Sequence, residues 1–417
     1  MIIHIKSAII VDPSNKNLHL KKRDILIKDG VIEKIAARIE VPSKAVKINF
    51  PNLHVSLGWF DSGVSFGEPG FEERETIAHG LQVAGKSGFT ELILNPNTYP
   101  LPDSSGAIVF LKNASKNAVS RLYPLGTLTV RSEGKELAEL YDMKNAGAIG
   151  FYDYKSPVAN SNLMKIALQY AQNFGGMVYS FPLDLEIAGK GVVNEGTVST
   201  RLGLKGIPAI AEELQVARDL SILEYTGGSL HIPTISSAQS VALIEAAKKK
   251  GLDVSCSVAL HNLWFDDEVL EGFDSNYKVL PPLRDKNDIK ALVKGLKSGA
   301  IDMVTTDHSP MDIEEKRVEF DYAAYGTLGL EHAFGILNSM MGMERTISLL
   351  TMGRERFGIP TPKLTTGSNA NLTLFNPDPE NVVTKDDILS TSKNSMFIGE
   401  SLKGQVYGVI CNDGVLI

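Results

Sequence analysis

The 417-residue sequence has little cysteine. Only Cys256 and Cys411 occur, far apart and outside any Cys-x-x-Cys pair, so neither a disulfide framework nor a zinc knuckle is expected. No apolar run reaches membrane-spanning length, and the start of the chain lacks a charged region followed by a cleavage site. The formal net charge of -7 provides no basic surface for nucleic acid. These absences predict a cytoplasmic protein that binds neither membranes nor nucleic acids.

Histidine is also sparse, and its spacing lacks the usual metal-binding patterns. The eight histidines form no His-x-His and no His-Glu-x-x-His pair, the spacings that place two ligands on one face of a strand or helix. No Ser-His-Asp order or nucleophile elbow is visible either. A zinc site elsewhere in the chain therefore has little support.

Regular alternation fills the middle of the chain. From about 51 to 365, strand-like and helix-like segments follow one another at the spacing of βα units, which predicts a parallel sheet closed into a barrel. Helical patterns cover 72–84 and 207–224. Strands are predicted at 89–94, 148–152, 176–181, 230–233, 254–258 and 301–306.

Both ends of the chain are β-like. Two short alternating runs flank Asp29-Gly30, which is a two-residue hairpin signal. Near the other end, 371–375 and 405–410 are strand-like and lead to a second turn at Asp413-Gly414. At 45.3 kDa the chain is long enough for a barrel plus an accessory unit.

A motif at 58–70 resembles the opening signature of the dihydroorotase branch of the amidohydrolase superfamily, P-G-x-x-D-x-H-x-H-x-R-E-P-G. The matching positions are Gly58, Asp61, Glu68, Pro69 and Gly70. Gly63 and Ser65 stand where the family has its two metal-binding histidines, and Gly67 stands where it has an arginine. Two histidines at i and i+2 would face one side of a strand and reach one metal ion. The flanking positions of the signature therefore match, whereas the positions of the two metal-binding histidines hold other residues.

Further segments along the chain resemble the same family. They are 95–100 (M-P-N-T-x-P), 151–154 (F-T-D-D), 178–180 (V-A-H), 231–237 (H-V-C-H-V-S-T), 277–284 (Y-K-x-N-P-P-L-R), 304–310 (A-T-D-H-A-P) and 367–372 (G-x-x-A-D-L). The resemblance implies a (β/α)8 TIM-type barrel at 51–365. It also implies a small β-sandwich domain formed by both termini, 1–50 and 366–417.

The resemblance assigns roles to individual positions. Asp307 corresponds to the metal-bound general base, although a helix cap or loop turn is an alternative reading. Asn97 matches a substrate-binding asparagine, although Asn-Pro-Asn is also an ordinary turn. Asp153 is one of two family aspartates, and which of the two faces the barrel mouth stays open. Three other positions are losses or departures: Ser180, Thr234 and Leu280, which replace two metal histidines and a substrate-binding asparagine.

His231 is expected to be packed or solvent-facing, because residues at i and i+3 on a strand face opposite sides. A catalytic zinc needs about three protein ligands, and the degenerate positions Gly63, Ser65, Asp153, Ser180, Thr234 and Asp307 do not supply them. No metal or other cofactor is therefore expected. Placing histidines at both Gly63 and Ser65 is expected to restore zinc affinity but little turnover.

Two function classes stay open. The first is a non-catalytic dihydroorotase-like protein of pyrimidine biosynthesis, acting as a structural or regulatory subunit. The resemblance then suggests a homodimer, with aspartate carbamoyltransferase as a candidate partner. The second is an enzyme: an active dihydroorotase or a related cyclic amidohydrolase that opens a cyclic amide with zinc, or a hydrolase that works without a metal.

Overall fold

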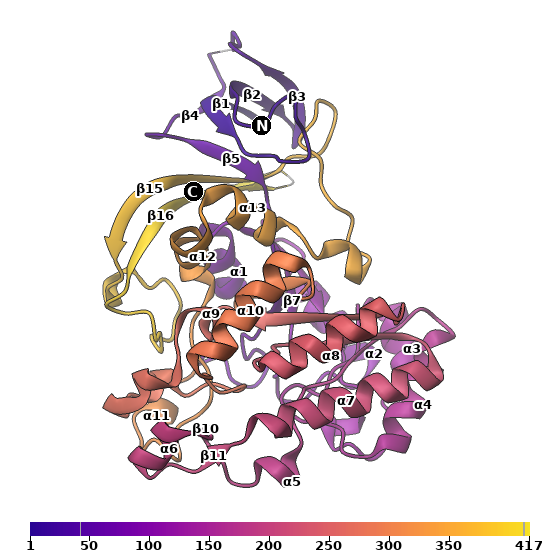
Figure 1. Cartoon of the computed structure of the whole chain (residues 1–417). Helices are drawn as coiled ribbons and strands as arrows, with labels where there is room; N and C mark the ends of the chain where they lie inside the picture. Colours follow the sequence, from indigo (N-terminus) through magenta and orange to yellow (C-terminus); the bar gives the residue numbers. More distant parts are fainter. Residues whose placement is uncertain (42, 412) are drawn as a thin grey trace.

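A computed structural model of the chain describes residues 1–41, 43–411 and 413–417. Figure 1 shows two parts, a terminal β-sheet that contains both ends of the chain and a larger part in which helices surround strands. No helix within the described residues is both long enough and apolar enough to cross a membrane.

The larger part is a closed parallel barrel. Its strands are β6 (Trp59–Val64), β7 (Phe89–Leu94), β8 (Arg121–Pro124), β9 (Met177–Tyr179), β12 (Ser229–Ile232), β13 (Val254–Ala259) and β14 (Met303–Thr305). Phe151 supplies the eighth position by parallel bridges to Gly126 and Val178, and a bridge from Val64 to His308 closes the ring. The predicted fold class is confirmed: an α/β barrel of the TIM type with a β domain built from both termini.

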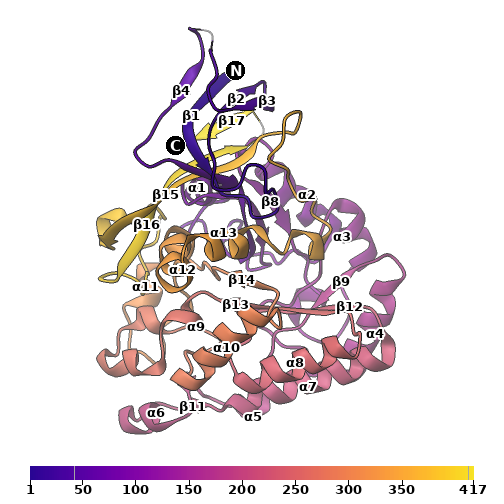
Figure 2. The ribbon, with the colours of Figure 1, turned by 45° about the horizontal axis from the view of Figure 1, so that its top comes forward.

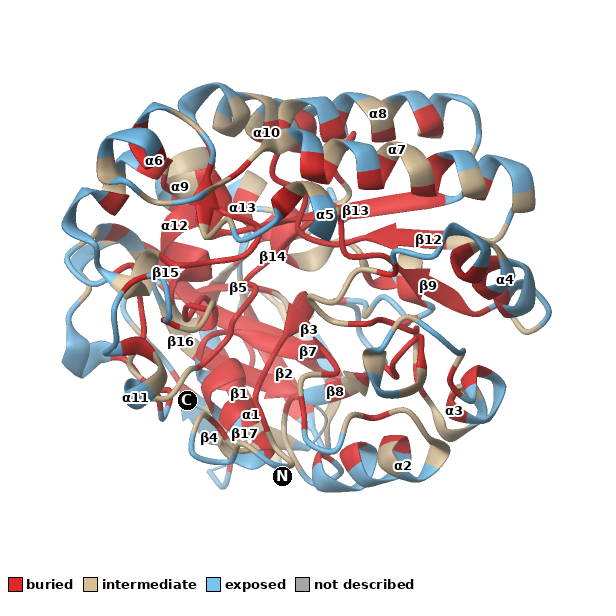
Figure 3. Ribbon diagram, turned by 90° about the horizontal axis from the view of Figure 1, so that it is seen from below, coloured by how far each residue is buried: buried red, intermediate tan, exposed pale blue. Residues whose placement is uncertain are grey.

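Helices cover the outside of the barrel, with buried inner faces and exposed outer faces (Figure 3). The longer ones are α1 (Ile77–Lys86), α2 (Ser105–Ala114), α3 (Leu140–Ala146), α4 (Ser161–Gln172), α7 (Ala209–Thr226), α8 (Ala238–Lys249), α10 (Lys286–Ser298), α12 (Ala333–Met341) and α13 (Met343–Thr351). Short elements lie in the loops: α5 (Leu185–Ala188), β10 (Val193–Asn194), α6 (Thr197–Leu202), β11 (Gly206–Ile207), α9 (His261–Trp264) and α11 (Ile313–Lys316).

The terminal sheet joins the two ends of the chain. It contains β1 (Ile2–Ile10), β2 (Lys22–Lys28), β3 (Val31–Ala36), β4 (Val46–Ile48), β5 (His54–Leu57), β15 (Asn371–Val382), β16 (Ser401–Cys411) and β17 (Gly414–Leu416). Their order is β17-β16-β15-β5-β1-β2-β3, with β4 paired to β1, and Figure 2 shows the C-terminal strands beside the N-terminal ones. Asp29 and Gly30 have φ angles of 49° and 74°, as the predicted two-residue hairpin turn requires.

Several elements differ from the sequence-based expectation. β5 lies beyond residue 50 yet belongs to the terminal sheet, where it pairs with β1 and β15. The chain passes directly from β5 to β6 at Gly58, where a Cβ would clash with Asn371 Oδ1 and Thr90 Oγ1. The helix predicted at 72–84 begins only at Ile77. The strand predicted at 148–152 is reduced to bridges at Phe151, and β8 was not predicted. The division of the chain into domains at 50 and 366 stays a prediction.

Candidate functional site

The C-terminal ends of β6, β7 and β14 meet at one side of the barrel mouth. The Ser65 amide donates to the His308 carbonyl (2.8 Å), and the Asn95 amide donates to the Val64 carbonyl (2.8 Å). Side chains that follow parallel barrel strands converge in this way at the mouth where active sites of such barrels lie. Three of the predicted positions lie on these strand ends: Gly63, Ser65 and Asp307.

Gly63 and Ser65 are packed into the barrel wall. A Cβ at Gly63 would lie 3.2 Å from Thr305 Oγ1 and 3.5 Å from Asn95 Nδ2. Ser65 is buried, and its Oγ accepts a hydrogen bond from Asn95 Nδ2 at 3.3 Å. Zinc in proteins is bound by Cys, His or carboxylate groups, so neither position offers it a usual ligand.

Asp307 forms an ion pair with a residue that the sequence reasoning missed. Lys155 Nζ lies 3.5 Å from Asp307 Oδ2, and the two side chains are 14% and 5% exposed. The same ammonium lies 5.1 Å from the centre of the Tyr154 ring. Burial raises the pKa of the Asp307 carboxyl, and the Lys155 charge opposes part of that rise. The sequence signal for Lys155 was its place directly after the 151–154 motif.

The side chain of Asp153, in the 151–154 motif, points toward the loop after β8. Asp153 Oδ1 accepts hydrogen bonds from the Leu128 and Thr129 amides, each at 2.9 Å, and Asp153 Oδ2 accepts from the Thr129 hydroxyl at 2.5 Å. The carboxylate therefore anchors the loop that follows β8. Asp153 is a loop anchor in this chain, and Lys155 is the residue that reaches Asp307.

Ser180 and Thr234 follow β9 and β12 and are held by neighbouring elements. Ser180 Oγ donates to Asp219 Oδ2 on α7 at 2.5 Å, and the adjacent Arg218 pairs with the same carboxylate group at 2.7 Å. Thr234 has a φ of 51°, and its amide donates to Ser257 Oγ at 3.2 Å. The resemblance places metal histidines at these two positions, and here both make structural contacts.

The surviving motif histidines are packed. His231 is fully buried, with Nδ1 2.8 Å from Ser255 Oγ and its ring 4.8 Å from that of Tyr179. Burial lowers the pKa of His231 well below its usual value. Of the two environments left open for His231, the packed one is correct. His308 Nδ1 accepts the Gly329 amide at 3.3 Å, so it supports a loop.

Of the three positions that the resemblance assigns to substrate, Asn97 is retained, and Gly67 and Leu280 differ from the family pattern. Asn97 Oδ1 is buried and has no hydrogen-bond partner among the described residues. Gly67 has a φ of 115°, and a Cβ there would lie 2.7 Å from the Phe71 carbonyl oxygen, so the present backbone has no room for the family's arginine. Leu280 is buried in the same apolar cluster as Phe181. The barrel is therefore apolar at the position of Leu280.

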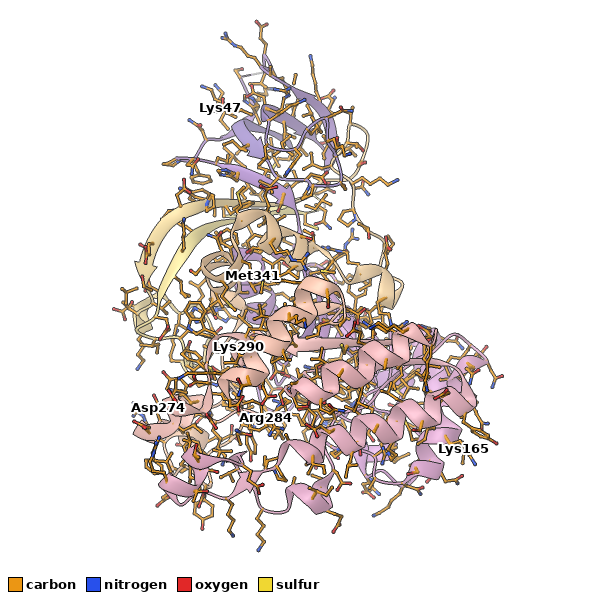
Figure 4. All side chains as sticks on the ribbon, in the orientation of Figure 1. Lys47, Lys165, Asp274, Arg284, Lys290 and Met341 are labelled. Carbon is orange, nitrogen blue, oxygen red and sulfur yellow. The ribbon has the colours of Figure 1, made fainter. Side chains whose placement is uncertain are left out.

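Motif residues that are unchanged from the family pattern connect neighbouring elements of the barrel. Asp61 accepts a hydrogen bond from Thr305 Oγ1 at 2.7 Å, which ties β6 to β14. Glu68 Oε2 accepts the Ile77 amide at 2.6 Å and so caps α1. Arg284, labelled in Figure 4, is buried and donates to one backbone carbonyl and two side-chain oxygens. Each of these retained motif residues makes structural contacts.

The resemblance implies zinc, which proteins bind through Cys, His or carboxylate groups. Within 1–41, 43–411 and 413–417, no three His, Cys, Asp or Glu side chains gather closely enough to hold a metal ion. Asp307 contributes a carboxylate, but its partner Lys155 carries a positive charge. These residues do not fit a catalytic zinc, which takes about three protein ligands.

Comparisons with known proteins agree on one family. The family model described as Dihydro-orotase-like matches residues 54–240. The dihydroorotase of Pelotomaculum thermopropionicum is 39% identical over 424 residues, covering 100% of this chain and 99% of that protein. The dihydroorotase of Syntrophus aciditrophicus is 37% identical over 414 residues, with 97% of each chain covered.

Solved structures share the fold at lower identity. The L-hydantoinase (dihydropyrimidinase) from Arthrobacter aurescens has a TM-score of 0.85 and 22% identity, covering 99% of this chain and 95% of that one. Dihydropyrimidinase from Brevibacillus agri has a TM-score of 0.83 and 19% identity, covering 100% and 95%. Full-length similarity to dihydroorotases, at 39% identity over 100% of this chain, shows that the chain belongs to the dihydroorotase-like family.

Proposed function

We propose that this chain is a non-catalytic member of its family that serves pyrimidine biosynthesis as a structural or regulatory subunit. The observation that carries the proposal is the Lys155 ammonium 3.5 Å from the Asp307 carboxylate. In the family pattern this aspartate is the general base, and such a base needs a metal-bound water to act on. Here the carboxylate is paired with a side-chain cation instead.

The substrate side of the mouth supports the same proposal. Dihydroorotate carries a carboxylate, and a buried carboxylate needs charged or hydrogen-bonding partners. Gly67 and Leu280 occupy the positions of the family's arginine and asparagine, and Leu280 is 9% exposed. Neither side chain can donate a hydrogen bond to that carboxylate.

One specific observation favours a second candidate, an active dihydroorotase or related cyclic amidohydrolase that uses zinc. A protein named dihydroorotase shares 39% of its residues over the whole length of this chain. Identity at that level describes the whole fold, however, and function depends on the groups at the site.

Metal content and turnover separate the two candidates. The full chain, purified with zinc supplied, is analysed for bound metal and assayed by absorbance for opening and closing of the dihydroorotate ring. The Pelotomaculum thermopropionicum dihydroorotase, handled identically, is the positive control. The proposal expects substoichiometric zinc and no zinc-dependent turnover. Stoichiometric zinc with turnover at rates typical of enzymes, about 1–1000 s⁻¹, would overturn it.

A non-catalytic subunit acts through assembly, so a homodimer and a complex with aspartate carbamoyltransferase are part of the proposal. Light scattering after gel filtration, with and without aspartate carbamoyltransferase, tests for both assemblies. A monomer that does not change in the mixture would contradict this part.

A further inference from the structure

We infer that Lys155 is a built-in replacement for the metal ion, an internal cation that compensates the buried charge of Asp307. The inference goes beyond the proposed loss of catalysis, because it assigns a cation-replacing role to a residue outside the matched motifs. It also explains how the barrel keeps an aspartate at its mouth without the metal that the family places there.

The first step is the cost of a lone carboxylate at this position. The Asp307 side chain is 5% exposed, and an ionised carboxylate removed from water is costly unless a partner compensates its charge. In the family pattern the compensating charge is a metal ion. In this chain the ammonium of Lys155 lies 3.5 Å from Asp307 Oδ2, within the distance of an ion pair.

The second step is the backbone. Lys155 has a φ of 54° and Asp307 has a φ of 44°, which is the left-handed region that residues other than glycine seldom adopt. Such conformations persist when surrounding contacts over-determine them. Two of them meet in one ion pair, between residues separated by 152 positions in the sequence. The pair holds both strand-end loops in this arrangement.

The third step is the cover around the pair. Tyr154 lies beneath the ammonium, 5.1 Å from ring centre to Nζ. Tyr154 packs against an apolar cluster inside the barrel that includes Leu280 and Phe181. Apolar surroundings weaken screening by water, so they strengthen the attraction between the two charges and raise the cost of removing either one. The positive charge of Lys155 would repel a metal cation that approached the Asp307 carboxylate.

A double-mutant cycle tests the inference on the full chain. Lys155→Met and Asp307→Asn each remove one charge with little change of shape. Each single variant leaves the other charge buried and unpaired, so its thermal midpoint should fall by about 4–6 °C for a chain of this length. The double variant should lose much less than the sum of the two. The matched control is the exposed pair of Lys250 and Glu224, 59% and 52% exposed, where Lys250→Met should shift the midpoint by about 1 °C or less.

Independent effects, in which the double variant loses the sum of the two single losses, would overturn the inference. If Lys155→Met gives no folded protein, recovery of folding by adding Asp307→Asn is the supporting result, and failure to recover overturns it. The cycle measures only coupling between two side chains. Its result is therefore separate from the zinc and turnover assay, which tests the proposed function.

Discussion

Because Lys155 is paired with Asp307, we now expect histidines at Gly63 and Ser65 not to be enough to restore zinc affinity, contrary to the expectation from the sequence alone. The triple variant Gly63→His, Ser65→His and Lys155→Met should bind zinc, and the double variant that keeps Lys155 should bind it far more weakly. A Cβ at residue 63 would lie 3.2 Å from Thr305 Oγ1, so Thr305 must shift by a few tenths of an ångström in both variants. The two variants differ only in the charge of Lys155.

The size of the effect follows from the ion pair. A zinc ion lies about 2.1 Å from a carboxylate oxygen that binds it, and Lys155 Nζ lies 3.5 Å from Asp307 Oδ2. A zinc ion on that oxygen would thus be at most about 5.6 Å from the ammonium. At an effective dielectric constant of about 20 the repulsion is then about 6 kcal/mol, or roughly four powers of ten in affinity.

Isothermal titration with zinc chloride measures both variants, and dihydroorotate turnover is followed by absorbance. The triple variant should show the tighter binding, by up to about 10⁴-fold, because relaxation of Lys155 reduces the difference. Turnover should stay negligible in both, since Gly67 and Leu280 offer the substrate carboxylate no partner. Equal zinc affinity in the presence and absence of Lys155 would refute the reasoning. The variant Lys155→Met alone is the control for binding outside the site.

Three further outcomes are expected. Arg354→Met should lower the free energy of unfolding in urea by about 3 kcal/mol, because Glu91, 2% exposed, loses its buried partner and keeps only the more distant Arg121 at 4.0 Å; an effect below about 1 kcal/mol, as expected at an exposed ion pair, would contradict this. Burial raises the pKa of Asp61 to about 6 in the folded protein, and because the unfolded chain releases that proton near pH 4, stability should fall as pH rises from about 4 to 6. Urea unfolding of the Asp61→Asn variant at several pH values from about 4 to 6 should show a smaller decrease of the unfolding free energy with pH than the unchanged chain shows. The same pH dependence in both proteins would contradict this prediction. Ser180→Ala should cost about 1–3 kcal/mol, since the buried Asp219 loses a donor at 2.5 Å, and unchanged urea stability would count against it.

Local patterns predicted much of the fold. The turn at Asp29-Gly30 could be recognised because its two positive φ angles depend on two neighbouring residues. The barrel could be expected because βα spacing and the family motifs are both visible along the chain. The strand at 148–152 could not be placed well, since its pairing reduces to bridges at Phe151 and depends on neighbours far away in the sequence. β5 joined the terminal sheet for the same reason, by pairing with β15.

The sequence by itself determined which residues stand at the motif positions, Gly63, Ser65, Ser180 and Thr234, and the resemblance predicts that they replace metal-binding histidines. Only the tertiary structure decided what the remaining charged groups do. It turned Asp153 toward the amides of the loop after β8 and brought Lys155 to Asp307. The physical reason is that a buried carboxylate is compensated by whatever charge the packed barrel places beside it. That neighbour lies 152 residues away along the chain, beyond the reach of any local pattern.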